Sequence, residues 1–157
     1  RLKAIMGVMM GLEDLTIVFP CHPRTLIRLR ETGLLEKISR AENIRLIKPV
    51  GYHRMLNLMK NARMVFTDSG GMQKEAFWLK TPCITLRDNT EWVETVNVGV
   101  NMLVGSDTTS ISQAVDRILH EEDFKEKFSE VQNPYDVGGA TNSILDILND
   151  FLTNGHG

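Results

Sequence analysis

Short apolar runs alternate with amphipathic helical patterns along almost the whole chain, and few folds accommodate that alternation. The apolar runs lie at residues 15–19, 44–47, 64–67, 83–86 and 102–104. They are continuous and rich in Val and Ile, which is typical of strands covered on both faces. Most follow one another at intervals of roughly 20 residues with a helix in each gap, the order of right-handed βαβ crossovers. The sequence therefore predicts an α/β fold, a Rossmann-like parallel sheet with helices on both faces.

The helical patterns are defined by apolar residues that return every three or four positions. The chain starts on one of them, at 1–10, and no capping residue precedes it. The others lie at 25–31 with an irregular continuation to 38, and at 52–61, 70–79, 91–96, 110–119, 121–130 and 140–152. Because the first residue is Arg1 and the first helix lacks a start signal, we expect the chain to be part of a longer protein. Residues 1–152 would form one domain, and residues 153–157 a frayed tail.

Composition excludes several classes of function. The 157 residues carry a formal net charge of −2, so there is no basic field for a nucleic acid backbone. No apolar run approaches the roughly 20 residues that a membrane span requires. Cys21 and Cys83 are the two cysteines, too few for a disulfide framework or a four-cysteine zinc site, and we expect no metal. Both lie in apolar segments, which predicts buried, reduced thiols in a cytoplasmic protein.

The segment 65–76 carries the clearest chemical signal, because a strand ends there and a helix begins within a residue or two. Ligands of parallel α/β sheets bind beyond the carboxyl ends of strands. Helix N-termini there present unpaired N–H groups and the positive end of the helix dipole. Gly70 and Gly71 would let an anion approach the backbone, and Ser69 adds a hydroxyl. The junction suits a phosphate or diphosphate, although an N-cap followed by a tight turn explains the same residues.

Three further side chains are candidates for the same site. Glu75 lies about one helical turn further on, where it could accept hydrogen bonds from a ribose; an exposed helical Glu is the alternative. His22 follows the first strand and faces the ligand side if that strand runs as predicted; a structural contact at the strand end is the alternative. Arg87 either neutralises charge near the site or pairs with Asp88 or Glu91.

Several motifs follow in a fixed order along nearly the whole chain, at residues 66–71, 73–76, 81–92, 97–99, 103–107 and 133–135. Together they resemble the C-terminal half of the non-hydrolysing UDP-N-acetylglucosamine 2-epimerases. The resemblance implies the C-terminal domain of a GT-B arrangement, in which two Rossmann-like domains face a cleft. It also implies interconversion of UDP-GlcNAc and UDP-ManNAc by elimination and re-addition of UDP, with no cofactor.

The resemblance also assigns roles to residues. Ser69, Gly70 and Gly71 match the diphosphate contacts of the family, and Glu75 matches its ribose-binding carboxylate. Val50 falls where family members contact the uracil through the backbone.

Other positions are less regular. Met55 stands where other members often have an aromatic residue near the base. The family also has a histidine loop just before the first helix, and acid/base carboxylates in the N-terminal domain. Neither is in this chain, so the resemblance implies no catalytic residue here. We expect the chain alone to bind UDP weakly or not at all and to lack epimerase activity.

Departures from the family leave alternatives open. Trp92 and Val93 replace an Arg and a Pro that are common in bacterial members, and residues 136–137 differ from the family's loop. The motif with Trp at position 92 resembles that of 2-epimerases of UDP-diacetamido-uronic acids. The predicted substrate is therefore that sugar or UDP-GlcNAc. A GT-B glycosyltransferase domain and a non-catalytic nucleotide-sugar sensor are further alternatives. The partners implied are UDP, a UDP-amino sugar, the N-terminal domain of the same chain and, through the last helix, a second copy.

Overall fold

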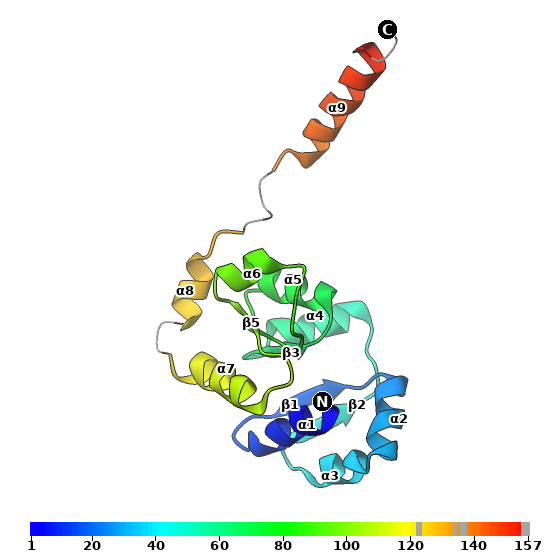
Figure 1. The fold of residues 1–157 in the computed structure, drawn as a ribbon, viewed down its shortest axis with the longest axis vertical. Coiled ribbons are helices and arrows are strands. Elements are labelled where there is room, and N and C mark those ends of the chain that lie inside the picture. Colours follow the sequence, from blue (N-terminus) through cyan, green and yellow to red (C-terminus); the bar gives the residue numbers. More distant parts are fainter. Residues whose placement is uncertain (122–123, 134, 136–137, 155–157) are drawn as a thin grey trace.

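The computed structural model describes residues 1–121, 124–133, 135 and 138–154 (Figure 1). Its strands are β1 (Ile17–Pro20), β2 (Ile44–Ile47), β3 (Val65–Thr67), β4 (Cys83–Thr85) and β5 (Asn101–Leu103). The helices before β4 are α1 (Leu2–Gly11), α2 (Pro23–Glu31), α3 (Leu34–Arg40), α4 (Tyr52–Lys60) and α5 (Gly70–Trp78). Those after it are α6 (Val93–Asn97), α7 (Thr108–His120), α8 (Phe124–Glu130) and α9 (Ala140–Asn154). The order confirms the predicted alternation of strands and helices.

Every strand ladder among these residues is parallel. β1 pairs with β2, and β3, β4 and β5 form a second sheet with β4 in the middle. Each crossover carries a helix, as parallel neighbours require. The carboxyl ends of β3, β4 and β5 therefore lie along one edge, and the chain leaves each strand there to reach its next helix. This edge includes the start of α5.

The two faces of β4 are covered by different helices. Ile84 packs with α7 residues in one buried cluster, whereas Cys83 packs with residues of α4, α5 and β3 in another. Neighbouring residues of a strand point to opposite faces, so a strand buried on both sides is apolar throughout. The predicted α/β sheet with helices on both faces is thereby confirmed.

The structure corrects two predicted boundaries. The expected continuation of the helix from 31 to 38 is broken, because Gly33 adopts a left-handed φ of 68° between α2 and α3, a conformation that ends helices. The first strand begins at Ile17 rather than at Leu15. Leu15 is apolar for another reason, since it packs against the cluster around α7. An apolar run shows burial, and burial alone does not distinguish a strand from a turn.

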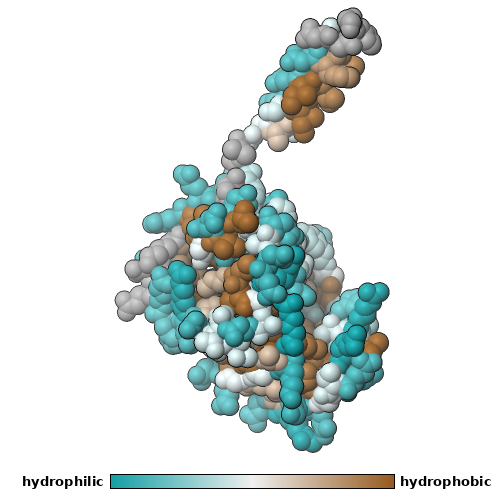
Figure 2. All heavy atoms as spheres, in the orientation of Figure 1, coloured by the Kyte–Doolittle hydropathy of each residue, from teal (hydrophilic) through white to brown (hydrophobic). Residues whose placement is uncertain are grey.

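Helix α9 extends away from the rest of the molecule, and all of its residues from 140 to 153 are exposed (Figure 1). Its apolar side chains gather along one side of the helix, as Figure 2 shows. They are Ile144, Leu145, Ile147, Leu148, Phe151 and Leu152, each at least half exposed. Within the described part of the chain, no helix combines the length and apolar character needed to cross a membrane.

Candidate functional site

The junction between β3 and α5 has the predicted strand-to-helix geometry. Ser69 is the N-cap of α5, and its Oγ accepts a hydrogen bond from the N–H of Met72 at 3.5 Å. The turn is closed by Thr67, whose Oγ1 accepts from the N–H of Ser69 at 3.0 Å. Gly70 and Gly71 are the first helical residues, where amides have no acceptor within the helix. The capping role of Ser69 and the helix-start amides of Gly70 and Gly71 are therefore combined in one segment.

Gly70 lies close to the segment that follows β4. A Cβ at this position would collide with the carboxylate of Glu91 and would lie 3.4 Å from Nε1 of Trp92. A Cβ on Gly71 would have only Ser69 Oγ nearby, at 3.9 Å. The two glycines thus differ, because a side chain at position 70 would displace the Glu91 carboxylate, whereas the space at Gly71 is open.

Arg87 and Asp88 find different partners. Nη1 of Arg87 lies 3.2 Å from Oε2 of Glu91, so Arg87 pairs with the carboxylate that covers Gly70. Asp88 pairs with Arg1, also at 3.2 Å, which places the start of α1 beside the end of β4. Both pairs are substantially exposed to solvent and contribute little to stability. Arg87 is nevertheless brought to the predicted diphosphate site through Glu91.

Glu75 faces Tyr52, the first residue of α4. The pKa of the Tyr52 hydroxyl is raised by desolvation, and further by the negative charge of Glu75 and a hydrogen bond to it. This pairing of the Tyr52 hydroxyl with the Glu75 carboxylate was not predicted from the sequence. The sequence feature that could have indicated it is the position of Tyr52. Tyr52 is the first residue of the helix after β2, as Gly70 is the first residue of the helix after β3.

The remaining predicted residues are more dispersed. His22 is the exposed N-cap of α2, and its Nδ1 accepts from the N–H of Arg24 at 3.2 Å, which is the structural contact at a strand end. Val50 is half-buried in the loop between β2 and α4. Met55 packs against the buried cluster of Met59, Val65, Ala76 and Cys83. The binding roles of these three residues stay predictions.

A buried polar network holds the segment after β4 against α5. Oε1 of Gln73 accepts from the hydroxyl of Thr90 at 2.6 Å and from Nδ2 of Asn101 at 3.0 Å. Asn101 also donates to Oγ1 of Thr95 at 3.0 Å and accepts from the hydroxyl of Thr85 at 2.6 Å. The network ties together the first turn of α5, strands β4 and β5, and α6. Sequence reasoning missed it, since its members are ordinary polar residues far apart in the chain.

Lys74 lies among aromatic rings on the outer side of α5. Its Nζ is 4.5 Å from the ring centre of Trp92, 4.7 Å from that of Tyr135 and 5.2 Å from that of Trp78. The hydroxyl of Tyr135 donates to Glu94 at 3.0 Å. Desolvation and this carboxylate raise the pKa of Tyr135 to about 12. Tyr135 thus anchors the segment after α8 to α5 and α6; the neighbouring residues 134 and 136–137 of that motif lie outside the described residues.

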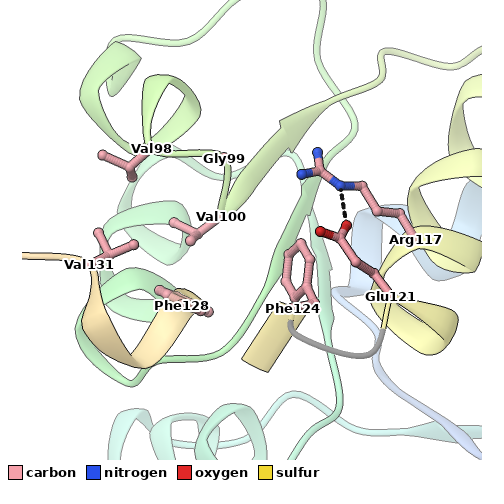
Figure 3. A pocket seen from close by; sticks show the side chains of 8 residues that line it. All are labelled: Val98, Gly99, Val100, Arg117, Glu121, Phe124, Phe128 and Val131. Atoms are coloured by element: carbon pink, nitrogen blue, oxygen red, sulfur yellow. Dashed lines mark hydrogen bonds and ion pairs between the residues drawn. The ribbon is translucent and has the colours of Figure 1, made fainter. Parts of the chain in front are cut away.

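A small cavity of about 100 Å³ lies elsewhere, between α8, the end of α7 and the residues leading into β5 (Figure 3). Val98, Val100, Phe128 and Val131 line one side of it, and Phe124 stands beside the Arg117–Glu121 ion pair on the other (Figure 3). Val98–Val100 precede β5, so the cavity is at the amino end of that strand. Ligand pockets usually enclose about 300 Å³ or more, so it does not compete with the α5 edge as a nucleotide site.

The two thiols are buried, as predicted. Cys21 and Cys83 are free and buried, and burial raises the pKa of the Cys83 thiol to about 11. His53 and His120 are exposed, and His156 lies outside the described residues. Throughout the described ranges, no cluster of three or more His, Cys, Asp or Glu side chains is arranged to hold a metal ion.

These features define a class of protein: a Rossmann-like domain of the GT-B kind, with a glycine-containing helix start at the carboxyl edge of its sheet. The family model for UDP-N-acetylglucosamine 2-epimerase matches residues 1–149. The chain therefore belongs to the UDP-N-acetylglucosamine 2-epimerase family.

Similar proteins come from archaea and bacteria. The UDP-N-acetylglucosamine 2-epimerase of Methanocaldococcus jannaschii is 45% identical over 151 residues, which are 94% of this chain and 40% of that protein. A crystal structure of that organism's enzyme in complex with UDP-GlcNAc and UDP superposes with a TM-score of 0.77 at 42% identity, over 94% of this chain and 39% of that one. A Pseudomonas aeruginosa UDP-2,3-diacetamido-2,3-dideoxy-D-glucuronate 2-epimerase is 47% identical over 90 residues, 57% of this chain and 24% of that protein. The chain thus spans about 40% of the length of the M. jannaschii enzyme.

Proposed function

We propose that this chain is the UDP-binding half of an enzyme that interconverts UDP-GlcNAc and UDP-ManNAc. The observation that carries the proposal is the start of α5, where Ser69 caps a helix that opens with Gly70 and Gly71 at the carboxyl end of β3. The similar M. jannaschii structure contains UDP-GlcNAc and UDP. Glu75, beside Tyr52 and one turn from Gly71, would accept hydrogen bonds from the ribose.

The reaction proposed is an elimination followed by re-addition. A base removes the proton from C2 of the sugar, the C1–O bond breaks, and UDP leaves with the bonding electrons, giving a 2-acetamidoglucal. UDP then adds back to C1 while C2 is protonated on the opposite face. Negative charge grows on the diphosphate as the C1–O bond breaks. Fixed amide donors at a helix start stabilise that charge in the transition state, and this is the contribution assigned to Ser69, Gly70 and Gly71.

The other predicted contacts complete the nucleotide site. The backbone of Val50 would contact the uracil, with Met55 near the base. His22 would face the ligand from the end of β1, and Arg87 would balance charge beside the diphosphate. None of these residues is assigned the role of the base at C2, which the elimination requires.

We therefore propose that the base lies on an N-terminal domain of the same protein. On that basis, the isolated chain would bind UDP weakly and would not epimerise the sugar. The exposed apolar side of α9, from Ile144 to Leu152, would be covered by that domain or by a second copy of the chain.

One observation favours a second candidate substrate, a UDP-diacetamido-uronic acid. Trp92 stands in the segment covering Gly70, and the P. aeruginosa relative acts, according to its name, on such a sugar. Both candidates use the same nucleotide site and the same elimination. They are distinguished by offering each UDP-sugar to the full-length protein and following formation of its C2 epimer.

Titration of the chain with UDP, followed by amide chemical shifts, tests the nucleotide site. We expect weak binding in the unaltered chain, weakened roughly tenfold or more by Glu75→Ala, since a hydrogen bond to a charged group contributes about 1.5–3 kcal/mol. Gly70→Val should abolish it by filling the diphosphate position. Glu42→Ala, which alters an exposed carboxylate before β2, is the matched control. Unchanged affinity in both site variants would remove the assignment.

A further inference from the structure

The indole N–H of Trp92 is buried and has no hydrogen-bond partner. Among the described residues, the buried side-chain nitrogen and oxygen atoms without a hydrogen-bond partner are Nε1 of Trp92 and Nε2 of Gln73. An indole nitrogen can only donate, and folded proteins rarely leave such a donor unsatisfied. Nε1 lies 3.4 Å from the point where a Cβ of Gly70 would be. The orphan donor is therefore beside the first residue of α5.

The ring that carries this donor is held on several sides. The backbone N–H of Trp92 donates to Oγ1 of Thr90 at 3.1 Å, and its carbonyl accepts from the hydroxyl of Thr95 at 2.7 Å. Lys74 Nζ lies over the ring at 4.5 Å, and Tyr135 contacts it edge-on at 5.9 Å between centroids. Because both backbone and ring are constrained, the direction of the N–H bond is set before any ligand arrives.

Glu91 occupies the space next to this donor. Oε1 of Glu91 lies closer than any other atom to the point where a Cβ of Gly70 would be. Oε2 of the same carboxylate lies 3.2 Å from Nη1 of Arg87. The Glu91 side chain is 50% exposed, so it can turn toward solvent without disrupting the core. A carboxylate thus lies where an incoming anion would have to be accommodated.

We propose that the indole N–H of Trp92 donates a hydrogen bond to a phosphate oxygen of the bound nucleotide, and that Glu91 covers this position until the nucleotide displaces it. The proposal rests on the proposed UDP site at α5 and adds two residues to it. Arg87 pairs with Glu91, and the Glu91 carboxylate lies over Gly70. On binding, the diphosphate takes the place of the carboxylate, and the previously unsatisfied indole gains an acceptor. Trp92 is a binding residue, and Glu91 competes with the ligand.

The indole protons can be observed directly, because the chain has only two tryptophans, Trp78 and Trp92. Trp78→Phe assigns the two indole signals in a proton–nitrogen correlation spectrum. Titration with UDP should move the Trp92 indole proton downfield together with the amides of Gly70 and Gly71, and should leave Trp78 in place. Uridine, which lacks the diphosphate, should not produce the Trp92 shift.

The possible results separate the two proposals. Shifts at Gly70 and Gly71 without a shift at the Trp92 indole would overturn the present inference and leave the UDP site intact. If UDP moves neither set of signals up to its solubility limit, the proposed function of this chain fails, and the inference fails with it. An equal indole shift with uridine would also overturn the phosphate contact.

Variants supply an independent measurement. Trp92→Phe retains a ring for Lys74 but lacks the donor, so UDP should bind roughly tenfold more weakly or worse. Glu91→Gln removes the competing charge and should tighten UDP binding several-fold. Trp78→Phe is the matched control, because Trp78 is half exposed and contacts Lys74 rather than Gly70. Unchanged affinity in Trp92→Phe, or weaker binding in Glu91→Gln, contradicts the assignment.

Discussion

The side chain of Asn101 is the centre of the polar network that joins the sheet to the segment covering α5. It is 2% exposed and takes part in three hydrogen bonds, accepting from Thr85 and donating to Gln73 and Thr95. Asn101→Ala removes all three. Gln73 retains the bond from Thr90, whereas the Thr85 hydroxyl is left with only the sulfur of Cys83 at 3.7 Å.

The expected loss follows from these bonds. A buried hydroxyl without a proper acceptor costs about 1–3 kcal/mol, and each of the other two lost bonds about 1 kcal/mol. We therefore expect Asn101→Ala to lower the free energy of unfolding by about 4 kcal/mol. For a domain of this size that corresponds to a fall in Tm of roughly 10 °C. Asn101→Asp keeps the shape but places an oxygen against the acceptors Gln73 and Thr95, so it should be at least as damaging.

Urea unfolding followed by circular dichroism measures both variants. Asn61→Ala is the matched control, because the Asn61 side chain also donates two hydrogen bonds but is exposed. Its removal should cost less than about 1 kcal/mol. A loss below about 1.5 kcal/mol in Asn101→Ala, or an Asp variant milder than the Ala variant, would refute the view that this network holds the site together.

Three further predictions concern the core, a helix cap and a thiol. Ile84→Ala, at a fully buried position of the central strand, should lower the free energy of unfolding by about 2–5 kcal/mol in the same urea assay. The carboxylate of Asp107 caps α7 by accepting from the N–H and hydroxyl of Ser110, and these bonds lower its pKa. The stabilisation by Asp107 is therefore present above the pKa of its carboxyl in the unfolded chain, and it is lost as the pH falls through the lower pKa in the folded protein. Asp107→Ala should lower Tm at pH 7, and the difference in Tm between the variant and the unaltered chain should shrink in acid. Cys83, whose thiol pKa is about 11, should react with a thiol reagent at pH 8 only when the protein is unfolded, and fast labelling of native protein would contradict this.

The elements that the sequence predicted best are those defined by local periodicity. The run at 64–67 became β3 because apolar residues suit strands with helices on both sides. The run at 44–47 became β2 although Arg45 within it is exposed. The expected irregular continuation of the helix from 31 to 38 is interrupted at Gly33, where one residue with positive φ separates α2 from α3. The family resemblance was confirmed by the match over residues 1–149.

The site was predicted only in part, for a related reason. Ser69, Gly70 and Gly71 are adjacent in the chain, so a strand end, a cap and a helix start could be identified together. The closeness of Glu91 and Trp92 to Gly70 could not, because it depends on how the segment after β4 folds back across the start of α5.

The sequence by itself determined which segments become strands and helices and where a helix start meets the carboxyl end of a strand, since these properties depend on residues within a few positions of one another. The tertiary structure decided which side chains surround that helix start. Arg87, Glu91 and Trp92 reach Gly70 because parallel neighbouring strands end at the same edge of the sheet. Contacts between residues some twenty positions apart follow from that pairing and from the packing of helices on the sheet.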